Sequence, residues 1–279
     1  MIFALQFIDL FSLPSVQRSA IALTIAGIAM PIIGVFIIGL DVITVRFAVM
    51  HMALFGTAIG LWVGMDPTLC ALIACVSTGL FLAPLSEKPG GLAGSMSFLM
   101  TISAAAALLV LSISGVNANG AFEILWGSIL AVRRQDLALI IATAICVLLF
   151  VAFTHRKLSI LLFDRELAKC SGIRVGSLTA ILLMLIAVSI GSSIRVTGAL
   201  LVDSITLLPA LGARNLATSL KSMIRWSILL GLTGNAVGFV IALQLDLPPG
   251  PVLVLVAGFV TLITYVATTR KRAFDLVTH

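Results

Sequence analysis

The chain has 279 residues, of which 61% are hydrophobic and only 10% are charged. A soluble domain of this size could not bury so much apolar surface, so the composition excludes soluble enzymes and binding modules and indicates a membrane protein. The net charge of +6 does not indicate a nucleic-acid partner, because the basic residues lie at the ends of apolar segments, where cytoplasmic loops and lipid headgroups favour them. Aromatic residues are few and no alternating apolar pattern is present, so we expect an all-α, polytopic helical protein rather than a barrel.

Apolar windows of about 17 residues or more predict the transmembrane helices. Residues 1–16 precede them and are expected to form an interfacial amphipathic segment, whereas residues 120–132 are expected to form a short helix at the outer face. Eight to nine spans are predicted, because one weak span could be re-entrant. The nine windows lie near residues 19–40, 47–65, 67–85, 97–115, 137–153, 176–193, 197–213, 226–245 and 251–269.

The distribution of Lys and Arg predicts the orientation of the chain. Nine spans with the N-terminus outside and the C-terminus inside leave only four basic residues outside, and the reverse orientation would invert that ratio. The outer four are Arg18, Arg133, Arg134 and Arg195. The 13 assigned to cytoplasmic segments are Arg46, Lys88, Arg156, Lys157, Arg165, Lys169, Arg174, Arg214, Lys221, Arg225, Arg270, Lys271 and Arg272.

A short charged segment at residues 163–172 interrupts the apolar spans on the predicted cytoplasmic side. Asp164 can cap the first turn of a helix there, and Gly172 can end it. A structured helix at this face favours the docking of a partner, although an ordinary interfacial linker would show the same pattern. No lysine follows a glycine, which excludes the phosphate-binding GxxxxGK[ST] loop, so this chain is expected to bind no ATP itself. Residues 1–279 are expected to form a single transmembrane domain.

Two ionisable residues stand out inside the predicted spans, namely His51 and Asp203. A carboxylate in the middle of a membrane costs about 2.5–3.5 kcal/mol on insertion scales, so Asp203 is expected to line a polar path; the alternative is a structural hydrogen bond to Ser192 or Thr206. His51 follows Met50, and imidazole with thioether suits soft or borderline cations, although a lone histidine can also be a packing residue. We therefore expect His51, Asp203 and Met50 to line a translocation path, with His51 and Asp203 as candidate metal ligands.

Four blocks, in order along essentially the whole chain, resemble the membrane permeases of metal-ion ABC importers, which take up zinc, manganese or iron. The charged segment resembles the coupling helix of that family. The blocks are residues 46–56, with His51 to Gly56 at the HAALPG-like position; Phe163, Asp164, Arg165, Glu166, Leu167 and Ala168 followed by Ser171 and Gly172; residues 197–214, similar to GxLLV…PAxxAR; and Asp246 to Gly250, a DLPPG turn.

The resemblance implies a transport subunit of the bacterial cytoplasmic (inner) membrane that is not itself an enzyme. Two permease copies would form the path for a divalent metal ion. Two cytoplasmic ATP-binding cassette subunits, holding ATP and Mg²⁺, would dock on the coupling helices, and an extracytoplasmic metal-binding protein would deliver the ion. Besides membrane lipid, these are the expected partners.

One position departs from the family pattern, which has an aspartate one turn before the histidine. Phe47 stands there, so the Asp-x-x-x-His pair on one helical face is lost, while Asp203 replaces a small or apolar residue. The lost carboxylate is either replaced from another helix, or the substrate is not a bare divalent cation. A histidine-centred site ranks zinc ahead of manganese.

The competing hypothesis is a secondary transporter driven by an ion gradient, with Asp203 as its coupling carboxylate; a third is a purely structural subunit. For the transport hypotheses, Asp203→Asn is expected to lower transport without lowering expression. The small residues Gly231, Gly234, Gly238 and Ala242 repeat on one face of the eighth span. They are expected to pack within the chain rather than at a dimer seam.

Overall fold

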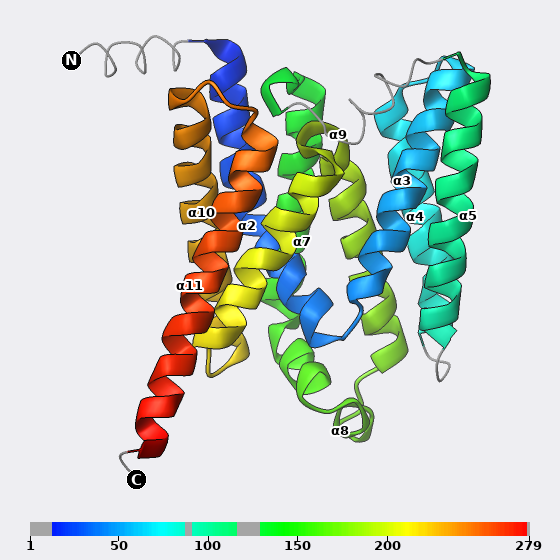
Figure 1. The fold of residues 1–279 in the computed structure, drawn as a ribbon. Helices are drawn as coiled ribbons and strands as arrows, with labels where there is room; N and C mark the ends of the chain where they lie inside the picture. Colours follow the sequence, from blue (N-terminus) through cyan, green and yellow to red (C-terminus); the bar gives the residue numbers. More distant parts are fainter. Residues whose placement is uncertain (1–12, 87–90, 116–128, 278–279) are drawn as a thin grey trace.

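A computed structural model describes residues 13–86, 91–115 and 129–277 of the chain. These ranges are almost entirely helical and contain no β-strand, which confirms the expected all-α membrane fold (Figure 1). The elements in chain order are α2 (Pro14–Gly39), α3 (Ile43–Val63), α4 (Pro67–Leu85), α5 (Gly91–Ile113), the 3₁₀ helix η1 (Ile129–Ala131), α7 (Arg134–Phe163), α8 (Arg165–Cys170), α9 (Val175–Leu216), α10 (Leu220–Gln244) and α11 (Pro249–Val277).

Helix α9 is a hairpin of two helical arms. Its backbone leaves the helical conformation at Gly198, with φ 76° and ψ 160°, a combination that is essentially restricted to glycine. Figure 1 shows the chain reversing at the upper end of the bundle and running back toward the lower end. We call Val175–Ile194 the first arm and residues 199–216 the second arm.

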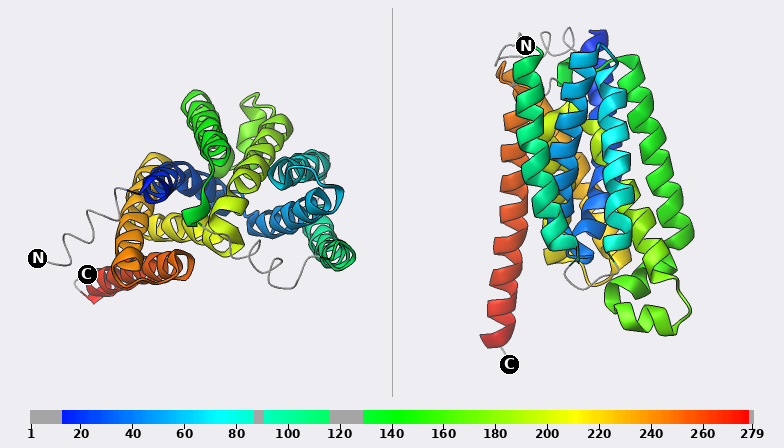
Figure 2. Two further views of the ribbon diagram at one scale, coloured as in Figure 1. Left: turned by 90° about the horizontal axis from the view of Figure 1, so that it is seen from above. Right: turned by 90° about the vertical axis from the view of Figure 1, so that its right-hand side faces the viewer.

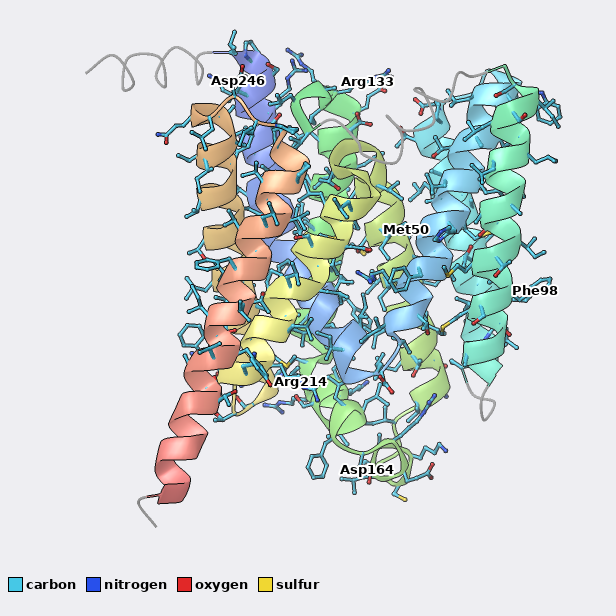
Figure 3. The ribbon with its side chains drawn as sticks, in the orientation of Figure 1. Met50, Phe98, Arg133, Asp164, Arg214 and Asp246 are labelled. Carbon is cyan, nitrogen blue, oxygen red and sulfur yellow. The ribbon has the colours of Figure 1, made fainter. Side chains whose placement is uncertain are left out.

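Eight of the described helices are long and apolar enough to cross a membrane, namely α2, α3, α4, α5, α7, the first arm of α9, α10 and α11. The nine predicted spans correspond to these eight helices and the second arm. Figure 1 shows α8 and the end of α11 at one end of the bundle and the start of α2 at the other. Asp164 and Arg214 are labelled at the α8 end in Figure 3, whereas Arg133 and Asp246 lie at the opposite end, so the two ends of the bundle separate these residues as the sequence analysis does.

Arg46 lies where the sequence analysis did not place it. It was assigned to a cytoplasmic segment, but it is the fourth residue of α3 and is only 5% exposed. The assignment was wrong because it assumed that a cation beside an apolar window lies in water. A cation can lie inside the membrane when it has a partner there. The predicted orientation does not depend on this one residue.

Two segments expected at the outer face fall partly outside the described residues. Of the interfacial segment at 1–16, residues 1–12 are not described, and α2 begins at Pro14. Of the short helix at 120–132, residues 120–128 are not described, and η1 begins at Ile129. The Ser19 hydroxyl of α2 donates to the Ile129 carbonyl oxygen at 2.5 Å, which ties η1 to α2.

The bundle consists of two groups of helices with the arms of α9 between them. Helices α3, α4 and α5 pack together on one side, and α2, α10 and α11 lie on the other (Figure 2). The first arm packs closely on α4, where a Cβ added at Gly191 would lie 2.8 Å from Cys75 Sγ. Both arms bury apolar residues, so α9 forms the centre of the core.

The small residues of α10 pack within the chain, as expected. A Cβ added at Gly231 would lie 2.7 Å from the Gly27 carbonyl oxygen of α2, and one added at Gly238 would lie 3.0 Å from Leu253 of α11. Beside Gly231, the Asn235 side-chain amide donates to the Leu23 carbonyl oxygen at 3.0 Å. Small residues allow this close approach of helices in the absence of a hydrophobic driving force.

Gly34 provides a test of this packing, because it lies directly against the second arm of α9. A Cβ at Gly34 would overlap the Thr206 carbonyl oxygen. We expect Gly34→Ala to lower the free energy of unfolding by about 1–3 kcal/mol, since the backbone must move to accept the methyl group. The control is Gly258→Ala in α11, where an added Cβ meets no described atom within 4 Å. Thermal melting in detergent measures both variants, and equal melting temperatures would contradict the packing.

Candidate functional site

An ion pair lies inside the membrane-spanning bundle. Asp203, on the second arm of α9, and Arg46, on α3, approach to 2.8 Å between Oδ1 and Nη1. The pair therefore connects the α3–α5 group to the arm of α9 that packs on α2. The Arg46 side chain is 6% exposed and the Asp203 side chain 22% exposed, so the carboxylate is the more accessible partner.

The sequence analysis did not foresee this partner of Asp203. The proposed structural alternative was wrong, because the Thr206 hydroxyl donates to the Val202 carbonyl oxygen and the Ser192 hydroxyl to the Ser189 carbonyl oxygen. The sequence contained one usable signal. An acid within a span needs a counter-charge, and Arg46 is a cation at the edge of a span.

The surroundings of Arg46 explain how a guanidinium is tolerated there. Its Cζ lies 4.4 Å from the centroid of the Phe47 ring, an arrangement that favours a cation–π interaction. Its Nε has no hydrogen-bond partner among the described residues. Asp203 and the Phe47 ring are thus the groups that compensate the buried charge.

His51 lies one turn further along α3 from Phe47. Its Nδ1 is 2.7 Å from the Phe47 carbonyl oxygen; because a carbonyl oxygen can only accept, Nδ1 is the donor, and in a neutral imidazole Nε2 would then carry the lone pair. His51 is also close enough to Asp203 for an electrostatic interaction. The structure therefore brings the two predicted ligands into one region. Met50, by contrast, packs against the main hydrophobic cluster, and Figure 3 labels it on α3.

The donor set at this site is small. Among the described residues, no group of three His, Cys, Asp or Glu side chains is placed to hold a metal ion. The lone pair of His51 and the carboxylate of Asp203 are two donors, and Arg46 balances the charge of the carboxylate. Such a set can bind a divalent cation only weakly, so that a bound ion can leave the site again.

Both arms of α9 carry buried hydroxyl groups that sequence reasoning missed. Ser189 and Ser193 on the first arm and Ser204 on the second are at most 4% exposed. Their hydroxyl oxygens have no hydrogen-bond partner among the described residues. Serine occurs throughout membrane helices, so its position in the sequence alone gives no signal.

Helix α8, which follows α7 in the chain, has the capped structure that the sequence predicts. The Asp164 carboxylate accepts from the backbone N–H groups of Glu166 and Leu167 at 2.7 and 2.9 Å. Gly172, with φ 75°, ends the helix: its N–H donates to the Lys169 carbonyl oxygen at 3.0 Å, and the next N–H donates to the Ala168 carbonyl oxygen at 3.1 Å. These two bonds form a Schellman motif.

The orientation of α8 leaves apolar side chains in contact with water. Ala168 is fully buried, whereas Leu167 on the same helix is 49% exposed and Phe163, the last residue of α7, is 83% exposed. Arg165 fixes the position of the helix by donating to the Ser86 carbonyl oxygen at the end of α4, at 3.0 Å. Glu166 pairs on the surface with Lys169 at 2.8 Å. A short rigid helix with exposed apolar residues is suited to contact with another protein.

Comparison with known families identifies the protein class. The model of the ABC 3 transport family matches residues 12–268, which is nearly the whole chain. The chain belongs to this ABC 3 transport family. The match confirms the resemblance to metal-ion ABC permeases drawn from the four sequence blocks.

Individual relatives match most of this chain. The manganese transport system membrane protein MntC of Halalkalibacterium halodurans is 28% identical over 254 residues, covering 90% of this chain and 87% of that protein. The high-affinity zinc uptake system membrane protein ZnuB of Haemophilus influenzae is 26% identical over 231 residues, covering 81% and 87%. A chain in the structure of PsaBC from Streptococcus pneumoniae in complex with Fab superposes with a TM-score of 0.80 at 25% identity, covering 95% of each chain.

Proposed function

We propose that this ABC 3 family member is the membrane permease of an ATP-driven importer for a divalent transition-metal ion. The match of the family model to residues 12–268 is the observation that supports this most strongly. The small donor set of His51 and Asp203 inside the bundle fits a path that an ion crosses without being retained. The protein would act in the bacterial cytoplasmic membrane.

The energy for transport comes from a separate ATPase in this proposal. Helix α8 is the coupling helix. Its exposed Leu167, together with the exposed Phe163 at the end of α7, inserts into a groove of an ATP-binding cassette subunit that holds ATP and Mg²⁺. One chain has one such helix, and paired ATPases need two, so the permease works as a homodimer. An extracytoplasmic metal-binding protein delivers the ion at the end of the bundle where α9 reverses.

The ion is zinc or manganese, with zinc ranked first from the single histidine at the site. One relative is named as a manganese transport protein and another as a zinc uptake protein, at similar identities of 28% and 26%, which supports both ions as candidates. His51 Nε2 suits zinc, and the Asp203 carboxylate suits either ion.

Uptake by proteoliposomes tests the proposal. The permease is reconstituted with its ATPase and binding protein, and accumulation of Zn²⁺, Mn²⁺ and Fe²⁺ is measured with and without ATP. We expect ATP-dependent accumulation of zinc or manganese and a purified complex whose native mass contains two permeases. Uptake by the permease alone, driven by an ion gradient, would establish the secondary-transporter hypothesis instead. That outcome would also require Asp203 to act while paired with Arg46.

A further inference from the structure

The family pattern places an acid at the position of Phe47. This chain has a phenylalanine there, with Arg46 beside it and Asp203 far away in the sequence. In the structure these three residues form one cluster: Arg46 lies between the Phe47 ring, at 4.4 Å, and the Asp203 carboxylate, at 2.8 Å. A transported cation needs the Asp203 carboxylate, which Arg46 already contacts. The function of the guanidinium therefore has to be explained together with that of the acid.

The two partners differ in accessibility. The Asp203 side chain keeps 22% of its surface exposed, whereas that of Arg46 keeps 6%. Asp203 Oδ1, which contacts Arg46, is itself buried, so a solute can approach the Asp203 side chain only at its remaining exposed part, while the guanidinium stays buried. His51 lies near enough to Asp203 to interact with it, and its Nε2 lone pair is free of the hydrogen bond made by Nδ1.

We propose that Arg46 is the resident counter-ion of Asp203 when no metal is in the path, and that a divalent cation entering between Asp203 and His51 replaces the guanidinium contact. The proposal rests on the metal-permease function given above. It makes Arg46 a residue that sets the affinity of the path. A carboxylate left alone in the membrane would hold a divalent cation tightly, and competition from Arg46 keeps the binding weak enough for release.

Phe47 has a defined part in this exchange. A guanidinium released from the carboxylate would be buried without its counter-charge, and its Nε has no hydrogen-bond partner among the described residues. The face of the Phe47 ring stabilises a cation at this distance, so Arg46 can rest on the ring while the metal is bound. The aromatic residue then supports the exchange where the family pattern has a metal-binding acid.

Metal binding to the purified permease–ATPase complex in detergent tests the exchange, with Zn²⁺ and Mn²⁺ titrated separately by calorimetry. We expect Arg46→Gln to tighten binding by about tenfold or more, because a unit charge next to the ion is removed. We expect the double variant Arg46→Gln/Asp203→Asn to lose that gain. Phe47→Leu should weaken binding, since the displaced guanidinium loses the ring. Arg18→Gln, which removes a positive charge near the start of α2, is the control and should bind as the wild type does.

The outcomes separate this proposal from the function on which it rests. If Arg46→Gln folds and binds either ion with wild-type affinity, or if Phe47→Leu leaves affinity unchanged, Arg46 is not a competing counter-ion. If the Arg46–Asp203 pair only held helices together, Arg46→Gln and Phe47→Leu would both lower the melting temperature, and neither would change the metal affinity. If the wild-type complex shows no ATP-dependent uptake of any of the metals tested, the proposed function itself fails.

Discussion

Replacing Phe163 and Leu167 together by aspartate should abolish ATP-driven uptake while the membrane-spanning helices stay folded. Both side chains are exposed, Phe163 at the end of α7 by 83% and Leu167 on α8 by 49%, so their loss removes little packing within the chain. In a protein interface, buried apolar anchors of this kind contribute about 2 kcal/mol or more each. Two of them therefore account for a loss of docking of several hundredfold or more. Co-purification of the ATPase and uptake by proteoliposomes measure the two effects.

A matched control comes from the same helix. Cys170 is exposed and is the last residue of α8, so Cys170→Ser should leave docking and uptake at wild-type levels. A proline at Glu166 would be a weak test of this helix, because Glu166 is the second residue of α8 and proline is tolerated in a first turn. Normal uptake by the Phe163→Asp/Leu167→Asp variant would remove α8 from the coupling mechanism.

Asp203→Asn should destabilise the protein as well as impair transport. The sequence alone predicts loss of transport with normal expression, but the substitution leaves the buried Arg46 guanidinium without its carboxylate. Removing one partner of a buried ion pair costs about 3–5 kcal/mol, because the remaining charge is uncompensated. Thermal melting in detergent and the yield of folded protein in membranes measure this loss.

The double variant Arg46→Met/Asp203→Leu identifies the cause. It removes both charges and keeps the volume, so its melting temperature should return close to that of the wild type, while uptake stays low because the carboxylate is absent. If Asp203→Asn melted at the wild-type temperature, the ion pair would contribute no stability. If the double variant melted lower than the single one, the loss would come from packing rather than from charge.

Much of the fold follows from local features of the sequence. Apolar windows predict the spans because a helix in lipid must cover about 30 Å with side chains that need no water. The cap at Asp164 and the stop at Gly172 also follow from local chemistry, since both satisfy backbone groups within a few residues. The break near residue 198 was visible as the short gap between two apolar windows.

The candidate site was predicted less completely, because its central contact joins residues far apart in the chain. His51 and Asp203 were found from their cost inside a membrane, but the depth of Arg46 depends on how α3 packs against the second arm of α9. No local pattern encodes that packing. The hydroxyl groups of Ser189, Ser193 and Ser204 were missed for the same reason, since only the tertiary structure shows that they are buried without partners among the described residues.

The reversal at Gly198 also determines whether the chain crosses the bilayer an odd or an even number of times. With the second arm as a separate crossing, α2 begins and α11 ends on opposite faces of the bundle (Figure 1). Were α9 a single continuous crossing, α10 and α11 would each run in the opposite direction, and the end of the chain would be exposed to the other compartment. A backbone conformation open essentially to glycine alone thus determines the sidedness of everything that follows residue 198.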